Sequence, residues 1–195
     1  MQIFNQNHSL FRQSNISLDE FEQFEKKIIE LAHSMQLRLD RVEIDHIALR
    51  VNKRKSAEDW LTLLLKCGTI LSGNIVNGRV IYLIQLDNPI RFSDQFIDII
   101  ELPFPKDKVY PVENWEHIEV IIPFEVNETV DEWVTRIRQQ FLWEELANLK
   151  VKVSEPKVDG EQLPNPSIAV SFVNQLENHT CIKVHPYHIK KIIEG

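Results

Sequence analysis

The stretch that decides the fold alternates between apolar and polar side chains: Glu43-Ile44-Asp45-His46-Ile47-Ala48-Leu49-Arg50-Val51. Ile47, Leu49 and Val51 fall on one face of an extended chain. His46 and Arg50 fall on the opposite face. This two-residue period predicts a half-buried β-strand with a histidine near its start.

A second stretch repeats the pattern later in the chain: Trp115-Glu116-His117-Ile118-Glu119-Val120-Ile121-Ile122. In both copies an acidic residue precedes a histidine, and alternating apolar residues follow. Each copy leads into a helical segment that carries an acid-tryptophan pair, Asp59-Trp60 or Glu132-Trp133. Each closes on a strand that runs into a proline, at Ile99–Pro103 and Cys181–Pro186. We therefore interpret the chain as one βαβββ unit used twice.

This interpretation predicts an α+β fold in which two βαβββ modules form a curved mixed sheet around a concave cup. The first module is expected at residues 43–106 and the second at 107–195, within one compact domain. Residues 1–42 form an N-terminal helical extension, because Ser17 and Glu20 have the spacing of a capping box and apolar residues follow at helical spacing.

Turn and cap residues place the elements inside each module. Asn77-Gly78 lies between two strand-like runs and predicts a tight hairpin. The helix of the first module is expected to begin at 56–59, with Gly68 terminating it. Thr129 and Glu132 predict a capping box at the start of the second helix.

Composition limits the classes of function. The chain is 43% hydrophobic and 26% charged, and its net charge of -7 disfavours nucleic acid or an anionic membrane as partner. The N-terminus lacks a signal-peptide pattern, and no apolar run approaches the roughly 20 residues of a membrane span. A cytoplasmic location is expected. Cys67 and Cys181 form no Cys-x-x-Cys motif, which excludes a zinc ribbon and disfavours a disulfide framework.

The strand pattern also places polar residues in the cup. Helices cover one face of such a sheet, so the apolar face of each strand must point toward them. His46 and His117 then point into the cup together with Arg50 and Glu119. Two imidazoles and one carboxylate on a shared concave face can hold a divalent metal and leave coordination sites open. Zn, Fe, Mn, Ni and Co all suit such ligands.

Four stretches of the chain resemble the YecM family within the vicinal oxygen chelate superfamily: Asp45–Arg50, Asn77–Arg79, Ile99–Pro103 and Glu116–Glu119. That superfamily includes glyoxalase I, extradiol dioxygenases and bleomycin-resistance proteins. The resemblance covers roughly residues 43–188, and the N-terminal extension is similar too. Superfamily members typically place metal ligands on the first and last strands of each module. The resemblance therefore implies that His46, Glu101 and His117 bind the metal.

The fourth position that the resemblance implies departs from the pattern, because it holds Lys183. An ammonium group is not a ligand and disfavours a nearby cation. His185 lies one pleat further on and could substitute, so three protein ligands plus water is the main expectation. Glu119 or Lys183 could transfer a proton. Arg50, Tyr82 and His185 are expected to contact the substrate.

Three classes of function follow. The first is a metal-dependent enzyme, an isomerase, lyase or dioxygenase, acting on a small oxygenated substrate. The second is a metal-free protein that sequesters a small ligand, as bleomycin-resistance proteins do. The third is an interaction module whose N-terminal helix exposes an apolar strip along 21–35. Both modules lie in one chain, so a monomer would suffice to build the cup, and a homodimer is the alternative.

Overall fold

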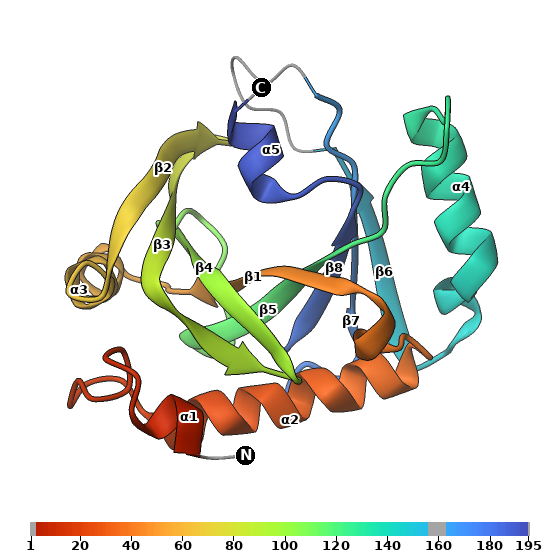
Figure 1. The fold of residues 1–195 in the computed structure, drawn as a ribbon. Coiled ribbons are helices and arrows are strands. Elements are labelled where there is room, and N and C mark those ends of the chain that lie inside the picture. Colours follow the sequence, from red (N-terminus) through yellow and green to blue (C-terminus); the bar gives the residue numbers. More distant parts are fainter. Residues whose placement is uncertain (1–2, 156–162, 195) are drawn as a thin grey trace.

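A computed structural model describes residues 3–155 and 163–194 of the chain (Figure 1). It contains the strands β1 (Glu43–Arg50), β2 (Gly68–Val76), β3 (Arg79–Phe92), β4 (Gln95–Pro103), β5 (Asn114–Ile121), β6 (Leu149–Ser154), β7 (Ser167–Phe172) and β8 (Cys181–His185). The helices are α1 (Ile3–Gln6), α2 (Leu18–Ser34), α3 (Arg54–Leu64), α4 (Val130–Phe141) and α5 (Ile189–Glu194), with short 3-10 turns η1 (Leu39–Arg41) and η2 (Trp143–Glu145).

All eight described strands form one curved mixed sheet in the order β2-β3-β4-β1-β5-β8-β7-β6. The sheet curls around a concave side, with α2, α3 and α4 outside it and α5 beside the opening (Figure 1). The predicted fold class, two βαβββ modules around a cup with an added N-terminal helix, is confirmed.

The two halves of the sheet have matching registers. β1 pairs with β4 in parallel, with Ile47 opposite Ile100, and β5 pairs with β8 in parallel, with Ile118 opposite Ile182. The halves meet where β1 and β5 run antiparallel, with Ile47 opposite Ile118. An approximate two-fold relationship through this pair therefore brings the first strands of both copies side by side at the centre of the sheet.

Local signals explain several of the boundaries. Asn77 and Gly78 both have positive φ angles, 50° and 77°, which a tight hairpin between β2 and β3 requires. At the start of α4, Thr129 and Glu132 form the predicted reciprocal capping box. At the start of α2, the Ser17 hydroxyl accepts a hydrogen bond from the Glu20 amide at 3.2 Å.

The first-module helix differs from its prediction at both ends. α3 begins at Arg54 because the Glu113 carboxylate, far away in sequence, accepts hydrogen bonds from the amides of Asn52 and Lys53. It ends at Leu64, and Gly68 begins β2 instead of terminating the helix. A Cβ atom on Gly68 would lie 2.5 Å from the Gln85 carbonyl oxygen, so glycine is required there by strand packing.

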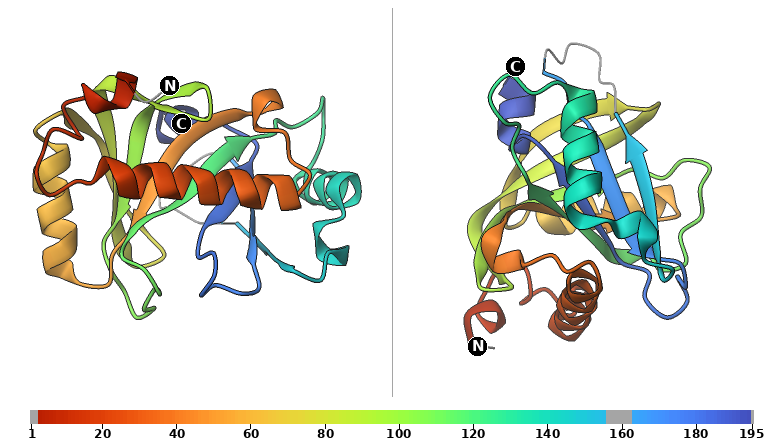
Figure 2. Two further views of the ribbon diagram at one scale, coloured as in Figure 1. Left: turned by 90° about the horizontal axis from the view of Figure 1, so that it is seen from below. Right: turned by 90° about the vertical axis from the view of Figure 1, so that its right-hand side faces the viewer.

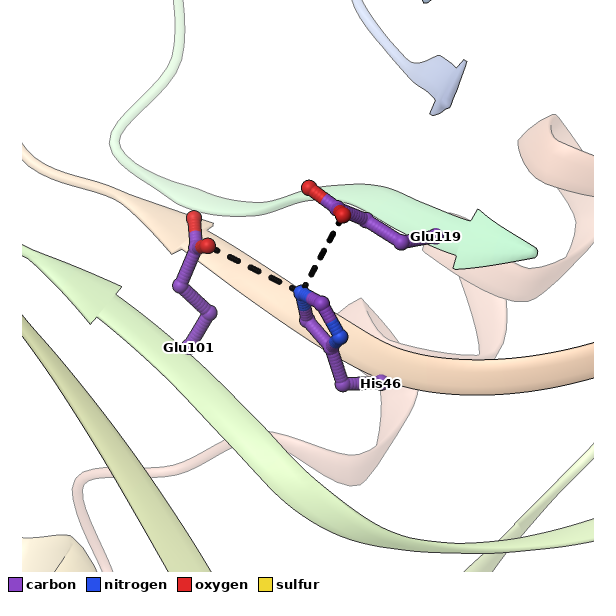
Figure 3. Close-up of side chains that lie close together, drawn as sticks. All are labelled: His46, Glu101 and Glu119. Atoms are coloured by element: carbon purple, nitrogen blue, oxygen red, sulfur yellow. Dashed lines mark ion pairs between the residues drawn. The ribbon is translucent and has the colours of Figure 1, made fainter. Parts of the chain in front are cut away.

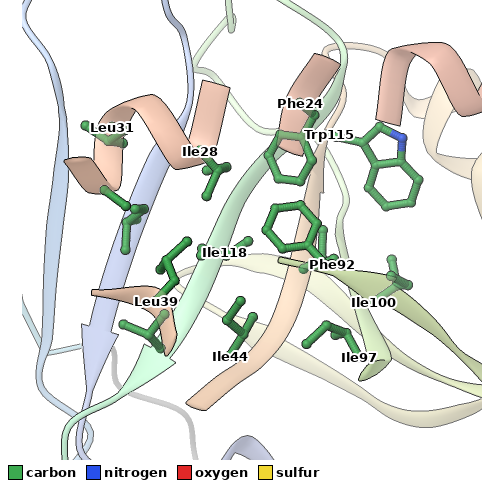
Figure 4. Packing of buried hydrophobic residues seen from close by; sticks show 14 of the residues in the cluster. Phe24, Ile28, Leu31, Leu39, Ile44, Phe92, Ile97, Ile100, Trp115 and Ile118 are labelled. Carbon is green, nitrogen blue, oxygen red and sulfur yellow. The ribbon is translucent and has the colours of Figure 1, made fainter. Parts of the chain in front are cut away.

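The core lies between the sheet and α2, which crosses the convex face (Figure 2). Phe21, Phe24 and Ile28 on α2 are at most 3% exposed. The Phe24 ring lies 5.4 Å from that of Phe92 and 6.4 Å from that of Trp115, measured between centroids (Figure 4). The apolar face of α2 is therefore a buried layer and not an exposed strip. No helix in the described ranges is long and apolar enough to span a bilayer.

Candidate metal centre

Each cup histidine is oriented by the acid that precedes it in sequence. Nδ1 of His46 lies 2.8 Å from Oδ2 of Asp45, and Nδ1 of His117 contacts Oε2 of Glu116. A carboxylate on Nδ1 fixes the ring and leaves Nε2 free to act as a ligand. The repeated acid-histidine pair in the sequence thus has a structural role, which inspection of the sequence did not assign.

Two glutamates lie between the two imidazoles. Nε2 of His46 is 3.7 Å from Oε2 of Glu101 and 3.7 Å from Oε2 of Glu119 (Figure 3). Nε2 of His117 is 3.8 Å from Oε1 of Glu101 and 3.3 Å from Oε1 of Glu119. Each imidazole therefore faces one oxygen of each carboxylate. Potential ligand atoms of His46, Glu101 and Glu119 all lie within 4.8 Å of one another.

This set differs by one member from the expected ligands His46, Glu101 and His117. In the antiparallel β1–β5 pair, His46 is opposite Glu119 and Ala48 is opposite His117. Glu119 therefore joins the tight cluster, and His117 flanks it. Glu119 was expected to transfer a proton, but its position favours metal coordination.

Two cations occupy the outer sides of the carboxylates. Nζ of Lys183 lies 2.9 Å from Oε1 of Glu119, and Nη1 of Arg50 lies 3.3 Å from Oε1 of Glu101. Burial favours protonation of both glutamates, but the neighbouring cations and histidines outweigh it and hold the pKa of each below its usual range. Lys183 stands at the second-copy counterpart of Glu101, because β8 pairs with β5 as β4 pairs with β1.

The cluster of charged side chains around His46 and His117 has more negative than positive charge. Its acids are Asp45, Glu101, Glu116 and Glu119, and its permanently charged bases are Arg50 and Lys183. Burial lowers the pKa of His46, but the carboxylates of Glu119, Asp45 and Glu101 outweigh this and raise it to about 10. Without a metal, a proton on His46 supplies part of the missing positive charge. A divalent cation would supply it more completely.

The residues fit such an ion. Nε2 of His46 is buried, has no hydrogen-bond partner and faces two carboxylate oxygens. Ligand atoms each about 2.1 Å from one ion lie roughly 3.0 to 3.4 Å apart at octahedral and tetrahedral angles. The 3.7 Å separations therefore require only a small contraction.

His185, the last residue of β8, is buried beside the candidate ligands. It is 1% exposed, and its Nε2 lies 3.8 Å from Oε2 of Glu119 and 3.5 Å from Oδ2 of Asp45. Burial lowers its pKa, so the ring is neutral near pH 7, and its Nε2 has no hydrogen-bond partner. Asp45 also contacts Nδ1 of His188 and accepts a hydrogen bond from the Ile189 amide, which links the cluster to α5.

The cluster borders a cavity of about 630 Å³ inside the cup. Arg50, Lys183 and His185, which were predicted to contact a substrate or to transfer a proton, line this cavity. Tyr82 does not line it, because alternation along β3 turns its side chain to the other face, where its ring packs 5.5 Å from that of Phe104. Tyr110 lines the cup instead, and it belongs to the segment between β4 and β5, residues 104–113.

Comparison with known proteins identifies the family. Residues 13–195 match the family model described as YecM protein. The chain belongs to the YecM family. It is 62% identical over 170 residues to an uncharacterised protein of Haemophilus influenzae, covering 87% of this chain and 88% of the relative. It is 36% identical over 164 residues to Protein YecM of Escherichia coli K12, covering 84% of each chain.

A solved structure, that of Protein EC4020, has the same fold. It superposes with a TM-score of 0.74 at 32% identity, covering 90% of this chain and 88% of the other. Family membership confirms the resemblance seen in the sequence. The paired βαβββ modules agree with the vicinal oxygen chelate architecture that this resemblance implies.

Proposed function

We propose that this YecM-family protein binds a divalent metal ion in its cup and uses it on a small substrate with two adjacent oxygens. The observation that carries the proposal is the buried Nε2 of His46, which lacks a hydrogen-bond partner and faces oxygens of Glu101 and Glu119. The substrate partner is a small molecule, not nucleic acid or membrane. We expect a monomer, since one chain supplies every residue of the site. We also expect a cytoplasmic location.

Each residue of the centre has a role in this proposal. His46, Glu101 and Glu119 hold the metal, which supplies Lewis acidity to the substrate oxygens when bound. Asp45 holds His46 in the ligating orientation. Lys183 keeps Glu119 ionised.

Proton transfer is best assigned to His185. Its ring is neutral, its Nε2 is unpaired, and it lines the cavity beside Glu119. Lys183 suits this task less well than its sequence position suggested, because its ammonium is held by Glu119 at 2.9 Å. Isomerase, lyase and dioxygenase chemistry are all compatible with this arrangement.

A metal-free binding protein is the second candidate. The Lys183–Glu119 and Arg50–Glu101 ion pairs already offset part of the carboxylate charge, which favours this alternative. The interaction-module hypothesis loses its supporting feature, because the apolar face of α2 is covered by the sheet.

Elemental analysis of untagged protein separates the two candidates. The protein is incubated in turn with Zn, Fe, Mn, Ni and Co salts and then dialysed. We expect near-stoichiometric metal in the wild type and a large loss in His46→Ala and Glu119→Gln. The control is His33→Ala, which removes an exposed histidine on α2. Absence of metal under all five conditions would reject the enzyme proposal and support metal-free binding.

His117→Ala distinguishes the two possible ligand sets. A set that includes His117 predicts a loss as large as in His46→Ala. The cluster observed here predicts a smaller loss, because His117 lies outside the group of mutually close ligand atoms.

A further inference from the structure

The segment between β4 and β5, residues 104–113, places Tyr110 at the cup. Two hydrogen bonds fix its backbone to the Asn52 side chain, from the Tyr110 amide to Oδ1 at 2.7 Å and from Nδ2 to the Tyr110 carbonyl oxygen at 2.9 Å. Glu113 in the same segment binds the amides of Asn52 and Lys53. Tyr110 is therefore held in one position at the cavity wall.

Three cations surround the Tyr110 side chain. Cζ of Arg50 lies 5.4 Å from the ring centre, and Nζ of Lys108 lies 4.5 Å from it. Arg79 lines the same cavity as Tyr110. Burial raises the pKa of the Tyr110 phenol, but Arg50 and Arg79 outweigh the effect and lower it overall. Positive charge thus gathers around one half-buried tyrosine.

The charges around the cavity are unbalanced. Six cationic side chains line it: Arg50, Arg79, Lys108, Lys150, Lys152 and Lys183. The carboxylates that line it are Glu101, Glu116 and Glu119, all of which belong to the candidate metal centre or contact Arg50. Arg50 and Lys183 pair with these carboxylates, but the other four cations form no ion pair within residues 3–155 and 163–194.

This surplus is unexpected in a chain whose net charge is -7. A concave wall with an excess of one sign of charge raises the local concentration of ligands of the opposite sign. Cations held near one another also repel, and a bound anion relieves that repulsion. A cavity of about 630 Å³ is in the usual range for a small-molecule site.

We propose that Arg79, Tyr110 and Lys108 form a subsite for an anionic group of the ligand, a carboxylate or a phosphate. Arg79 offers the planar donor fork that binds such groups in bidentate fashion. Arg50 contacts both the Tyr110 ring and Glu101, so the subsite adjoins the candidate metal centre. The ligand would therefore have an oxygenated head near the metal and an anionic tail on the subsite; the assignment of the head rests on the proposed function.

Three probes that share a hydroxy-acid head test the subsite. D-Glycerate has no anionic tail, malate has a carboxylate tail, and 3-phosphoglycerate has a phosphate tail. Binding is measured by titration calorimetry on metal-free and metal-loaded protein. We expect at least one tailed probe to bind about tenfold more tightly than glycerate, and its identity distinguishes carboxylate from phosphate.

Substitutions assign this preference to the subsite. The tail preference is the ratio of the affinity for the tailed probe to the affinity for glycerate. It should fall below about threefold in Arg79→Gln and in Lys108→Gln. It should persist in Lys26→Gln, which removes an exposed lysine on α2. Arg79→Lys should retain part of it, because the charge remains and the planar fork is lost. If Arg79 only anchors the segment between β4 and β5, Arg79→Gln lowers the melting temperature and leaves the tail preference unchanged. That result overturns the proposal.

The outcomes for the two proposals are separable. Equal binding of all three probes, or no binding of a tailed probe at roughly 10 mM, overturns the anion subsite even if metal binds. A tail preference that persists in metal-free protein and is lost in Arg79→Gln supports the subsite even if the metal proposal fails.

Discussion

His46 lies directly opposite Glu119 in the antiparallel β1–β5 pair, and its Nε2 is 3.7 Å from Oε2 of that carboxylate. The two residues come from the first strands of the two modules, so the candidate centre exists only when both modules pair. Glu101 on β4 completes the cluster from the neighbouring strand. A metal bound there would therefore stabilise the junction between the modules as well as serve the chemistry.

Asp45→Asn should weaken metal binding by about 10- to 100-fold, because the His46 ring loses the charged acceptor that fixes its orientation. Metal titration against a competing chelator measures the change. The control is Asp40→Asn, which alters an exposed acid paired with Arg38. Unchanged affinity in Asp45→Asn would show that His46 is not a ligand or does not need this acceptor.

Lys183→Met should have opposite effects on the metal-free and metal-bound proteins. Loss of the ammonium leaves Glu119 buried without its closest cation, so metal-free protein should lose about 3 kcal/mol of stability. Metal should then bind about tenfold more tightly, since Lys183 no longer competes for the carboxylate.

Thermal melting with and without metal tests the Lys183 prediction. Lys55→Met is the control, because it removes a lysine from an exposed pair with Asp59 and should change neither quantity appreciably. A metal-induced rise in melting temperature that is smaller in Lys183→Met than in the wild type would contradict the prediction.

Glu116 should make the protein sensitive to acid. Burial raises the pKa of its carboxyl group, but Arg50 and His117 outweigh this and lower it from 4.5 to about 2. A carboxylate with a depressed folded-state pKa contributes stability that is present above about pH 4.5 and is lost as the pH falls toward 2. The contribution of this group is on the order of 3 kcal/mol.

Urea unfolding between pH about 5 and about 2.5 measures this acid sensitivity. Glu116→Gln should flatten the acid limb of the stability curve, because the titrating group is gone. Glu145→Gln, which alters an exposed acid in η2, should leave the limb unchanged. Identical acid limbs in wild type and Glu116→Gln would show that other carboxylates account for acid unfolding.

Two adjacent isoleucines on α2 test how the N-terminal extension is attached. Ile28 is 0% exposed against the sheet, whereas Ile29 is 45% exposed. Ile28→Ala should cost about 2–5 kcal/mol of unfolding free energy, and Ile29→Ala less than about 0.5 kcal/mol. Chemical denaturation measures both, and similar costs would contradict the observed packing of α2.

Much of the architecture follows from the sequence by itself. The period-two stretches predict the strands β1 and β5, Asn77-Gly78 predicts the β2–β3 hairpin, and Thr129 predicts the start of α4. These signals are local, since a turn, a cap or an alternating face is determined by residues close together in the chain. His46 could likewise be placed in the cup from alternation alone.

Tertiary structure decided the members of the candidate metal centre, the start of α3 and the position of Tyr110. Each of these depends on groups that are distant in sequence. Only the β1–β5 register brings Glu119 opposite His46 and places His117 opposite Ala48. The Glu113 carboxylate, from the segment between β4 and β5, determines where α3 begins. Tyr110 lies in a segment without periodicity, and its place at the cavity is set by hydrogen bonds to Asn52 that no local pattern encodes.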